Sequence, residues 1–379
     1  MTILGVFTLL AGLVFSAQET TLTVKVSEPD SQVEVLDEAG KVEVTRTTDH
    51  KGTLTIAVEP GQHRLRVHKI GFDLFTKDFE MESGGKRTMT AKLVRLKDTT
   101  TPIWRKQVAD LPAERQMDAV AKKLKELNPG FDGAFKYKVE KGAVVELEFL
   151  TDNVTDLFPI RVLAQLKVLK CAGSGPGKGN LTELTPIKGM QITALTCSRN
   201  PKLTDFSPLK GMPLSGLNCD KTNVSDLSPL KGMKLGYLNC GDTPVADLSP
   251  LKGMPLSELL CDNTQVSDLS PLAGMTLKSL SISGSQVSSL SPLKDLKLTG
   301  LNCGRTRVSD LSPLRGMQLT ALNCKETEIT IFSPLKDLLL KTLWFNFNPK
   351  RDSEIIRSIK TLETINDQPA AEFLRNEAK

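Results

Sequence analysis

The chain has 379 residues, which is enough for two or three domains with a substantial hydrophobic core. Its 49 basic and 44 acidic residues leave a net charge of only +5, which argues against a surface built for nucleic acid. Aromatic residues make up 5% of the chain, so platforms for stacking bases or sugars are scarce.

The first 17 residues, MTILGVFTLLAGLVFSA, are apolar and carry no charged side chain. This run is shorter than the roughly 20 residues that cross a bilayer as a helix. It ends in Ser16 and Ala17 and is followed by polar residues, a pattern typical of a signal peptide or a short membrane anchor over 1–17. Because no Lys or Arg precedes the run, a buried helix and a truncated membrane span remain alternative interpretations. The segment predicts an extracytoplasmic protein, in the periplasm, in the cell envelope or secreted.

Residues 20–96 alternate apolar and polar residues in short segments separated by turn residues such as Pro60-Gly61 and Gly84-Gly85. Strands are expected at 21–26, 32–36, 54–58, 63–72 and near 87–95. Short strands with few helix formers predict a small β-sandwich. The stretch PGQHRLRVHKIGF resembles the PEGA domain, a small bacterial β-module, and the resemblance implies a position outside the membrane.

Residues 97–143 are expected to hold a linker and a capping helix. Apolar residues recur there at helical spacing, on one face: Met117, Val120, Ala121, Leu124 and Leu127. Pro112 fits the first turn of this helix, and Asn128-Pro129-Gly130 fits its end. A helix with one apolar face, placed directly before a repeat array, can cover the open end of the array. A plain linker is the alternative.

One unit repeats every 21 residues over most of the region 144–366. The proline of its Ser-Pro-Leu triplet stands at positions 208, 229, 250, 271, 292, 313 and 334. Degenerate copies surround Pro159 and Pro186, and a divergent copy, LKTLWFNFNP, follows at 340–349, which makes about ten units. The composite unit, L-x-x-L-x-C-x-x-T-x-V-x-D-L-S-P-L-K-G-M, resembles the leucine-rich repeat in the short form of bacterial internalin-like proteins.

The resemblance implies a solenoid. The predicted fold class is therefore α+β with repeats: a small β-sandwich, then a helix-capped leucine-rich-repeat solenoid with 21-residue repeats, and a helical tail over 367–379. Each unit is expected to supply one strand and one short helical turn. In one unit, Ser228 would cap this turn, Pro229 would be its first helical residue and Gly232 would end it in the left-handed conformation.

All seven cysteines occupy the same slot of the unit, which in other copies holds Phe149, Ile282 or Phe345. Isoleucine cannot replace a metal ligand, but it can replace a small core residue. Neighbouring thiols would lie about 4.8 Å apart with parallel side chains, a poor geometry for a disulfide. The sequence therefore predicts a ladder of buried thiols, with partial disulfides or a metal site as alternatives. The members are Cys171, Cys197, Cys219, Cys240, Cys261, Cys303 and Cys324.

Three further columns follow the same period. A threonine hydroxyl is expected to bond the backbone of its own or the adjoining coil. An aspartate two residues before Ser-Pro is expected to accept backbone N–H groups at the turn, with a calcium ladder as the alternative. A basic row is expected to be solvated, with docking of an anionic polymer as the alternative. The columns are Thr222, Thr243, Thr264, Thr306 and Thr327; Asp205, Asp226, Asp247, Asp268 and Asp310; and Lys188, Lys210, Lys231, Lys252, Lys294, Arg315 and Lys336.

The search for catalytic motifs argues against an enzyme. GSGPGKGN at 173–180 suggests a phosphate loop, but Ala172 stands where a Gly is needed and Gly179 stands where Ser or Thr would bind magnesium. We expect a flexible insertion there, in a repeat of 26 residues. The three histidines, His50, His63 and His68, all precede the repeats, so no imidazole there can serve a nucleophile or a zinc site. No catalytic residue, cofactor or metal is predicted.

The order of the segments carries a second resemblance. The PEGA-like module, the helix of LPAERQMDAVAKKLKELNPGFDG, the repeats and the closing TLETINDQPAAEF together resemble the extracytoplasmic region of bacterial transmembrane serine/threonine kinases. The kinase signatures themselves do not occur in this sequence. The resemblance implies a sensor or adaptor region, so a detached regulatory region of a membrane kinase system is the alternative function.

The main functional hypothesis is a non-catalytic, exported binding protein that uses the concave strand face of the solenoid. The expected partner is a protein or a cell-wall component, not a nucleic acid. Several glycines and serines of this face are too small to anchor a partner. The four asparagines of one column, at 218, 239, 302 and 323, are more typical of repeat duplication than of selection for a ligand. The candidate contact residues are Asn218, Tyr237, Asn239, Glu258, Leu260, Asp262, Asn302, Asn323, Lys325 and Trp344.

Overall fold

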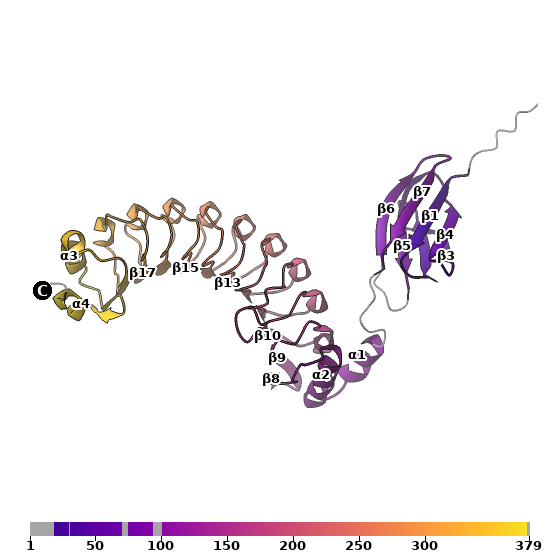
Figure 1. Ribbon diagram of the computed structural model, residues 1–379, viewed down its shortest axis with the longest axis horizontal. Helices are drawn as coiled ribbons and strands as arrows, with labels where there is room; N and C mark the ends of the chain where they lie inside the picture. Colours follow the sequence, from indigo (N-terminus) through magenta and orange to yellow (C-terminus); the bar gives the residue numbers. More distant parts are fainter. Residues whose placement is uncertain (1–18, 30, 70–74, 94–100, 377–379) are drawn as a thin grey trace, which may run out of the picture. The chain divides into compact units, whose positions relative to one another are not determined.

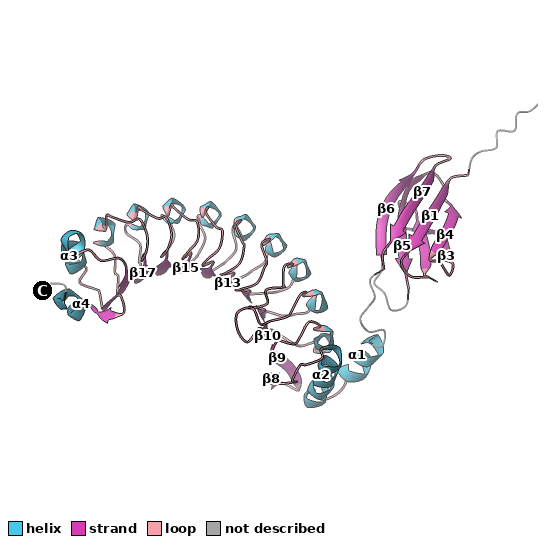
Figure 2. Ribbon diagram, viewed as in Figure 1, coloured by secondary structure: helices cyan, strands magenta, loops and turns pink. Residues whose placement is uncertain are grey.

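The structure is a computed structural model that describes residues 19–29, 31–69, 75–93 and 101–376. The predicted signal peptide or anchor at 1–17 lies outside the described residues. The chain divides into two compact units, Met1–Trp104 and Arg105–Lys379 (Figures 1 and 2).

The first unit is a β-sandwich of two sheets, with strand orders β4-β1-β7 and β3-β2-β5-β6. Alternate residues of both sheets, including Leu22, Val35 and Leu65, form one buried core. Two strands, β3 and β6, were not predicted, because β3 is exposed along most of its length and β6 buries only its last part. The strands are β1 (Thr21–Val26), β2 (Gln32–Leu36), β3 (Val42–Thr47), β4 (Thr53–Ala57), β5 (Gly61–His68), β6 (Phe75–Met81) and β7 (Lys86–Ala91).

Two helices, α1 (Thr101–Ala109) and α2 (Ala113–Leu127), precede the solenoid. Helix α2 buries Met117, Val120 and Leu124 and packs on the first turn of the solenoid, η1 (Phe158–Val162). The predicted capping helix is therefore confirmed.

A 13-stranded sheet runs through the solenoid in chain order, from β8 to β20. Strands β8 and β20 pair antiparallel at the two edges, and all strands between them pair in parallel. The central leucines stay in register from coil to coil, as Leu217 opposite Leu238. The strands line the inner side of the arc (Figure 1). They are β8 (Lys136–Glu140), β9 (Ala143–Leu150), β10 (Val168–Ala172), β11 (Ala194–Thr196), β12 (Gly216–Asn218), β13 (Tyr237–Asn239), β14 (Glu258–Leu260), β15 (Ser279–Ser281), β16 (Gly300–Asn302), β17 (Ala321–Asn323), β18 (Thr342–Trp344), β19 (Thr364–Ile365) and β20 (Gln368–Pro369).

Short 3-10 turns form the outer side of the solenoid (Figure 2). Ser228 is not the N-cap of its turn, contrary to the prediction: it is the first residue of the turn, and the N-cap is Leu227, which makes no side-chain cap hydrogen bond. Gly232 ends this turn with a φ of +77°, as predicted. After η1, the turns are η2 (Thr185–Ile187), η3 (Ser207–Leu209), η4 (Ser228–Leu230), η5 (Ser249–Leu251), η6 (Ser270–Leu272), η7 (Ser291–Leu293), η8 (Ser312–Leu314) and η9 (Ser333–Leu335).

Aromatic clusters close both ends of the solenoid. Phe149 takes the cysteine slot of the first coil and packs against Phe131 and Phe135 of the N-terminal cap, with ring centroids 6.0 and 5.5 Å away. Phe345 takes the same slot of the last full coil, and its ring lies 5.1 Å from that of Phe332. Beyond it, α3 (Pro349–Ser358) and α4 (Ala370–Asn376) cover the C-terminal end. Large rings thus replace cysteine where a cap, and not another identical coil, is the neighbour.

Candidate functional site

The seven cysteines are free and buried, as the repeat pattern predicts. Burial raises the pKa of Cys171, Cys240 and Cys303 to about 12. A thiol with so high a pKa forms almost no thiolate at neutral pH, and the thiolate is the form that attacks substrates and binds metals. The cysteine ladder therefore packs the core.

The threonine column also serves the fold. Each hydroxyl donates to the carbonyl oxygen of the cysteine three residues earlier, at 2.6–2.8 Å. This is one of the two partners predicted, the backbone of the same coil. The bond satisfies the cysteine carbonyl at the point where the strand ends and the chain turns.

The aspartate column caps the 3-10 turns in place of the serine. Asp226, for example, accepts from the Ser228 N–H at 2.7 Å and from the Ser228 hydroxyl at 2.7 Å. These hydrogen bonds hold the pKa of all five aspartates below the ordinary value. Where the column holds Ser289, its hydroxyl accepts the same N–H, so the slot needs an acceptor and not a carboxylate. That replacement supports capping over calcium.

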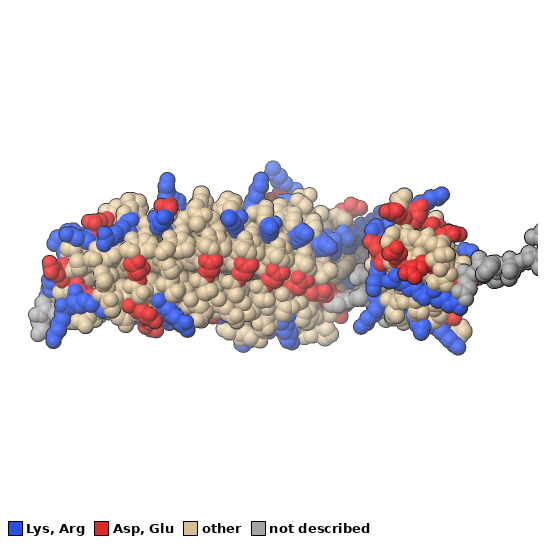
Figure 3. All heavy atoms as spheres, turned by 90° about the horizontal axis from the view of Figure 1, so that it is seen from above, with Lys and Arg blue, Asp and Glu red and all other residues tan. Residues whose placement is uncertain are grey.

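Figure 3 looks onto the outer side of the solenoid and shows acidic side chains in a row, with basic side chains beside them. The two columns produce this pattern because most turns carry an aspartate before them and a lysine or arginine after them; Ser289 and Ile331 interrupt the acidic column, and Ala273 interrupts the basic one. The basic residues are exposed, in agreement with a solvated row. A polyanion on this face would meet both signs of charge at once.

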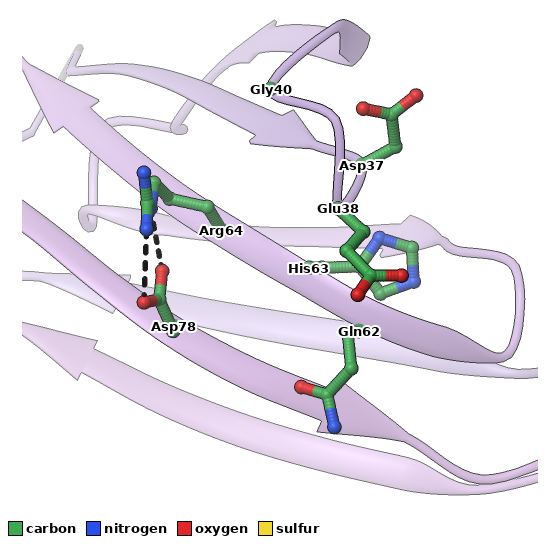
Figure 4. A pocket seen from close by; sticks show the side chains of 7 residues that line it. All are labelled: Asp37, Glu38, Gly40, Gln62, His63, Arg64 and Asp78. Carbon is green, nitrogen blue, oxygen red and sulfur yellow. Dashed lines mark hydrogen bonds and ion pairs between the residues drawn. The ribbon is translucent and has the colours of Figure 1, made fainter.

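The β-sandwich carries a hollow of about 340 Å³ lined by both acidic and basic groups, shown in Figure 4. Arg64 there forms a bidentate ion pair with Asp78, with hydrogen bonds of 2.6 and 3.1 Å. His63 is 6% exposed, and its Nε2 lies 2.8 Å from the Glu59 carbonyl oxygen. Its Nδ1 lies 2.9 Å from a Glu43 carboxylate oxygen, without the alignment of a hydrogen bond. These partners give His63 a place in the β-sandwich core and no nucleophile to activate.

The 173–180 insertion is held by the coils on either side, contrary to the flexible loop we expected. Ser174 donates from both its backbone N–H and its hydroxyl to Asp152, at 2.8 and 2.6 Å. The insertion passes so close to the next coil that a Cβ at Gly179 would lie 2.3 Å from Asn200 Oδ1. Gly173 and Gly179 therefore serve close packing.

The strand face of the solenoid brings the candidate contact residues together in columns. Tyr237 and Glu258 lie side by side in the first strand position, and Leu260 follows the asparagines in the third. Asp262 and Lys325 come two residues after the third position and so continue the same face. All but Lys325, which is exposed, are half-buried. The third-position column contains Asn218, Asn239, Leu260, Asn302, Asn323 and Trp344.

The asparagine column has a structural role that the sequence did not reveal. In each of the four copies the side-chain oxygen accepts the backbone N–H two residues on, at 3.0–3.2 Å. The oxygen is thus used inside the coil. At Asn302 the amide nitrogen is used as well, since it donates to the Ser281 hydroxyl at 3.0 Å.

At its N-terminal end the face carries charged residues that the sequence analysis missed. Lys170 on β10 bonds Glu146 on β9 at 2.7 Å and lies 3.6 Å from Glu148, which Lys136 also bonds at 3.0 Å. The bond to Glu146 raises the pKa of Lys170, and the bond to Lys136 lowers that of Glu148. The sequence offered one signal that could have identified them: these residues fall on the outward-facing strand positions of the degenerate first copies of the repeat.

The middle of the face carries Tyr237 next to Glu258. Burial of the ring, and then the Glu258 carboxylate, raise the pKa of Tyr237 above its ordinary value. The phenol therefore stays protonated at neutral pH, as a donor beside an acceptor.

Toward its C-terminal end the face is hollowed. The hollow has a volume of about 290 Å³ and is lined by small and neutral residues from β15, β16 and β17 and by Trp344 from β18. Ser279, Gly300 and Ala321 occupy the first strand position, where neighbouring coils place Tyr237 and Glu258. Ser281 and Gly300, two of the small residues that we expected to contribute little, therefore help to form a hollow on this face.

Trp344 forms one wall of the hollow, and a hydrogen bond holds its ring in place. Its indole N–H donates to Asp367 Oδ1 at 2.8 Å. Asp367 and Asn366 form the turn between β19 and β20, with φ of +69° and +48°. The polar tip of the ring thus points to the closing hairpin, and its apolar surface is left for the hollow.

Comparison with solved structures gives internalins from Listeria monocytogenes. An internalin (inlF) of strain 4b F2365 has 22% identity and a TM-score of 0.51, over 68% of this chain and 92% of that chain. An internalin C2 (inlC2) of the same strain has 26% identity and a TM-score of 0.39, over 61% and 92%. The functional domain of InlJ, which includes a cysteine ladder, has 26% identity and a TM-score of 0.43, over 59% and 48%. No family model and no curated protein matches the sequence.

The likeness to inlF shows the fold: the second unit is an internalin-like leucine-rich-repeat solenoid, and the predicted fold class is confirmed. Within the part of the chain that the structure describes, no helix is long and apolar enough to cross a membrane. Across the same residues, no group of three or more His, Cys, Asp or Glu side chains is placed to hold a metal ion.

Proposed function

We propose that this chain is a non-catalytic binding protein whose solenoid holds a protein partner on its concave strand face. The observation that carries this proposal is the register of the long parallel sheet, which fixes outward side chains of successive coils in straight columns. A surface fixed before binding loses little conformational entropy when a partner docks.

The chemistry of the other features supports binding rather than catalysis. The thiols are protonated and buried, the aspartates cap turns, and the buried histidine contacts Glu59 and Glu43 in the β-sandwich. The cysteines, the capping aspartates and His63 thus have structural tasks.

Export to the cell envelope or the medium is part of the proposal and rests on the apolar segment 1–17. It is tested by fractionating cells and measuring the mass of the N-terminus. A protein found only in the cytosol with an intact N-terminus would contradict it.

The alternative proposal is that residues 20–96 form a PEGA-like module and that the chain is a detached regulatory region of a membrane kinase system. The test is a pull-down with the protein as bait. A regulatory region should capture a membrane kinase from membrane extract, whereas an envelope protein should capture a component of purified cell wall. Identification of the captured molecule by mass spectrometry separates the two.

The binding face is tested by two pairs of substitutions in the full chain. Tyr237→Ala with Glu258→Ala should weaken partner capture about tenfold or more, because large aromatics supply much of the energy of an interface. Lys231→Glu with Lys252→Glu changes the exposed outer row and should have little effect at physiological salt, where charges are screened beyond about 8 Å. If the lysine pair abolishes capture and the Tyr237–Glu258 pair does not, the binding site lies on the outer side and an anionic partner is favoured.

A further inference from the structure

We infer that the hollow beside Trp344 receives one uncharged, apolar side chain of the protein partner, and that an acidic residue next to this anchor pairs with Lys325. This inference rests on the proposed function and names the chemistry of the partner.

The size of the hollow fits one side chain. Its volume of about 290 Å³ lies at the lower limit of sites for small molecules, which run from about 300 to 1,000 Å³. Interfaces between proteins concentrate their energy in a few such places, where a large side chain of one protein fills a pocket of the other.

The lining excludes a charged occupant, since none of its residues carries a charge. Its polar groups are mostly used already. Asn302 donates to the Ser281 hydroxyl at 3.0 Å and accepts from the Gly304 N–H, while Ser281 donates to Asp262. The Trp344 N–H is held by Asp367. A sugar would need several free donors and acceptors, whereas an apolar side chain needs none.

A positive charge stands two residues after Asn323, which lines the hollow. This residue, Lys325, follows β17 on the same face and is exposed, and within the described residues its ammonium group has no ion pair. Among the described residues no partner is found for the Asn323 amide nitrogen, and the oxygen of the same side chain accepts the Lys325 N–H at 3.1 Å. A positive charge and a free donor beside an apolar hollow favour an apolar residue followed by Asp or Glu.

Gly300 offers a way to close the hollow without disturbing the fold. A Cβ at this position would meet only Ser279 Oγ, at 3.8 Å, and Gly300 does not have a positive φ. Gly216 lies in the same strand column outside the hollow, with nothing within 4 Å of a Cβ. Gly300→Leu and Gly216→Leu are thus the same substitution in the same column, one inside and one outside the hollow.

The probe is a phage-displayed library of random 12-residue peptides, selected on the full-length protein. Synthetic copies of the enriched peptides are then titrated by calorimetry. Enriched peptides should share a Leu, Met, Phe or Trp with a nearby Asp or Glu. Gly300→Leu should weaken them about tenfold or more. Gly216→Leu, beside Tyr237 and outside the hollow, should weaken them less than Gly300→Leu. Lys325→Glu should weaken the acidic peptides about threefold to tenfold.

Ala321→Tyr fills the hollow from the next coil and serves as a second variant, and thermal melts verify that each variant folds. Peptides weakened by Tyr237→Ala but not by Gly300→Leu or Ala321→Tyr would overturn this inference and leave the proposed function standing. If no enriched peptide is weakened by any substitution on the strand face, the proposed function fails as well. Binding of a neutral N-acetylglucosamine oligosaccharide that Gly300→Leu abolishes would make the hollow a glycan site and overturn the inference.

Discussion

Asn128 and Asp156 are joined by a reciprocal pair of hydrogen bonds between the cap and the first coil. The Asn128 side-chain nitrogen donates to the Asp156 carbonyl oxygen at 2.9 Å, and its oxygen accepts the Asp156 N–H at 2.9 Å. The same side chain bonds the Leu124 carbonyl oxygen and the Thr155 N–H, at 3.0 and 2.9 Å. One amide thus fastens the end of α2 to the solenoid.

We expect Asn128→Ala to lower the free energy of unfolding by about 3 kcal/mol, because it leaves buried backbone groups without partners. Asn153→Ala is the control. Asn153 is exposed and makes one bond nearby, to the Gly130 carbonyl oxygen at 3.1 Å, so its loss should cost less than about 1 kcal/mol. Urea denaturation measures both. Equal losses would mean that Asn128 does not fasten the cap.

Deletion of 235–255, one 21-residue unit, should leave a folded and shorter solenoid, since each coil contacts mainly its neighbours. Removal of 112–127 should instead expose the apolar end that α2 covers and cause aggregation. Size-exclusion chromatography with light scattering distinguishes the outcomes. The capping role would be refuted by two deletions that behave alike.

Cys240→Ser should destabilise the fold by about 1–3 kcal/mol, because a hydroxyl without a partner is buried in place of a thiol. Cys240 is completely buried and its pKa is raised to about 12. Folded protein should accordingly show almost no reactive thiol, and the denatured, unreduced chain should show all seven. A denatured count of three or fewer would establish disulfides.

The solenoid should lose stability in acid. Hydrogen bonds from the serine hydroxyl and N–H lower the pKa of Asp247 and its counterparts in the folded state. Since the folded-state pKa is the lower one, the stabilisation is complete above the ordinary carboxyl pKa of about 3.9 and is lost as the pH falls through the folded-state value. Melting temperatures from pH 7 to pH 3 should fall below about pH 4. Asp226→Ala with Asp247→Ala should flatten this dependence, and an unchanged profile would contradict the capping role.

Asp367→Ala should release the Trp344 ring and weaken peptides that use the hollow by about threefold to tenfold, because the pocket wall is no longer fixed before binding. Trp344 emission, recorded with Trp104→Phe as background, should shift at the same time. Thr364→Ala alters the same strand pair, through a bond to Thr342 at 3.1 Å, without touching the indole. If both variants bind equally well, Asp367 has no part in recognition.

The sequence by itself determined the solenoid. A 21-residue period fixes which residues of successive coils become neighbours, so the replacement of cysteine by Ile282 already identifies a core slot. The left-handed Gly232 and the buried face of α2 follow from local chemistry, which the sequence carries in full.

Tertiary structure alone decided where the strand face is hollow. The bond of Asp226 to the Ser228 N–H is local and was predicted; the bond of Asn302 to the Gly304 N–H is equally local but was not predicted from the repeat pattern. The hollow depends on side-chain size in three consecutive coils and on a tryptophan held by a hairpin beyond the repeats. A repeat pattern describes the average coil, whereas a binding surface arises where particular coils differ from that average.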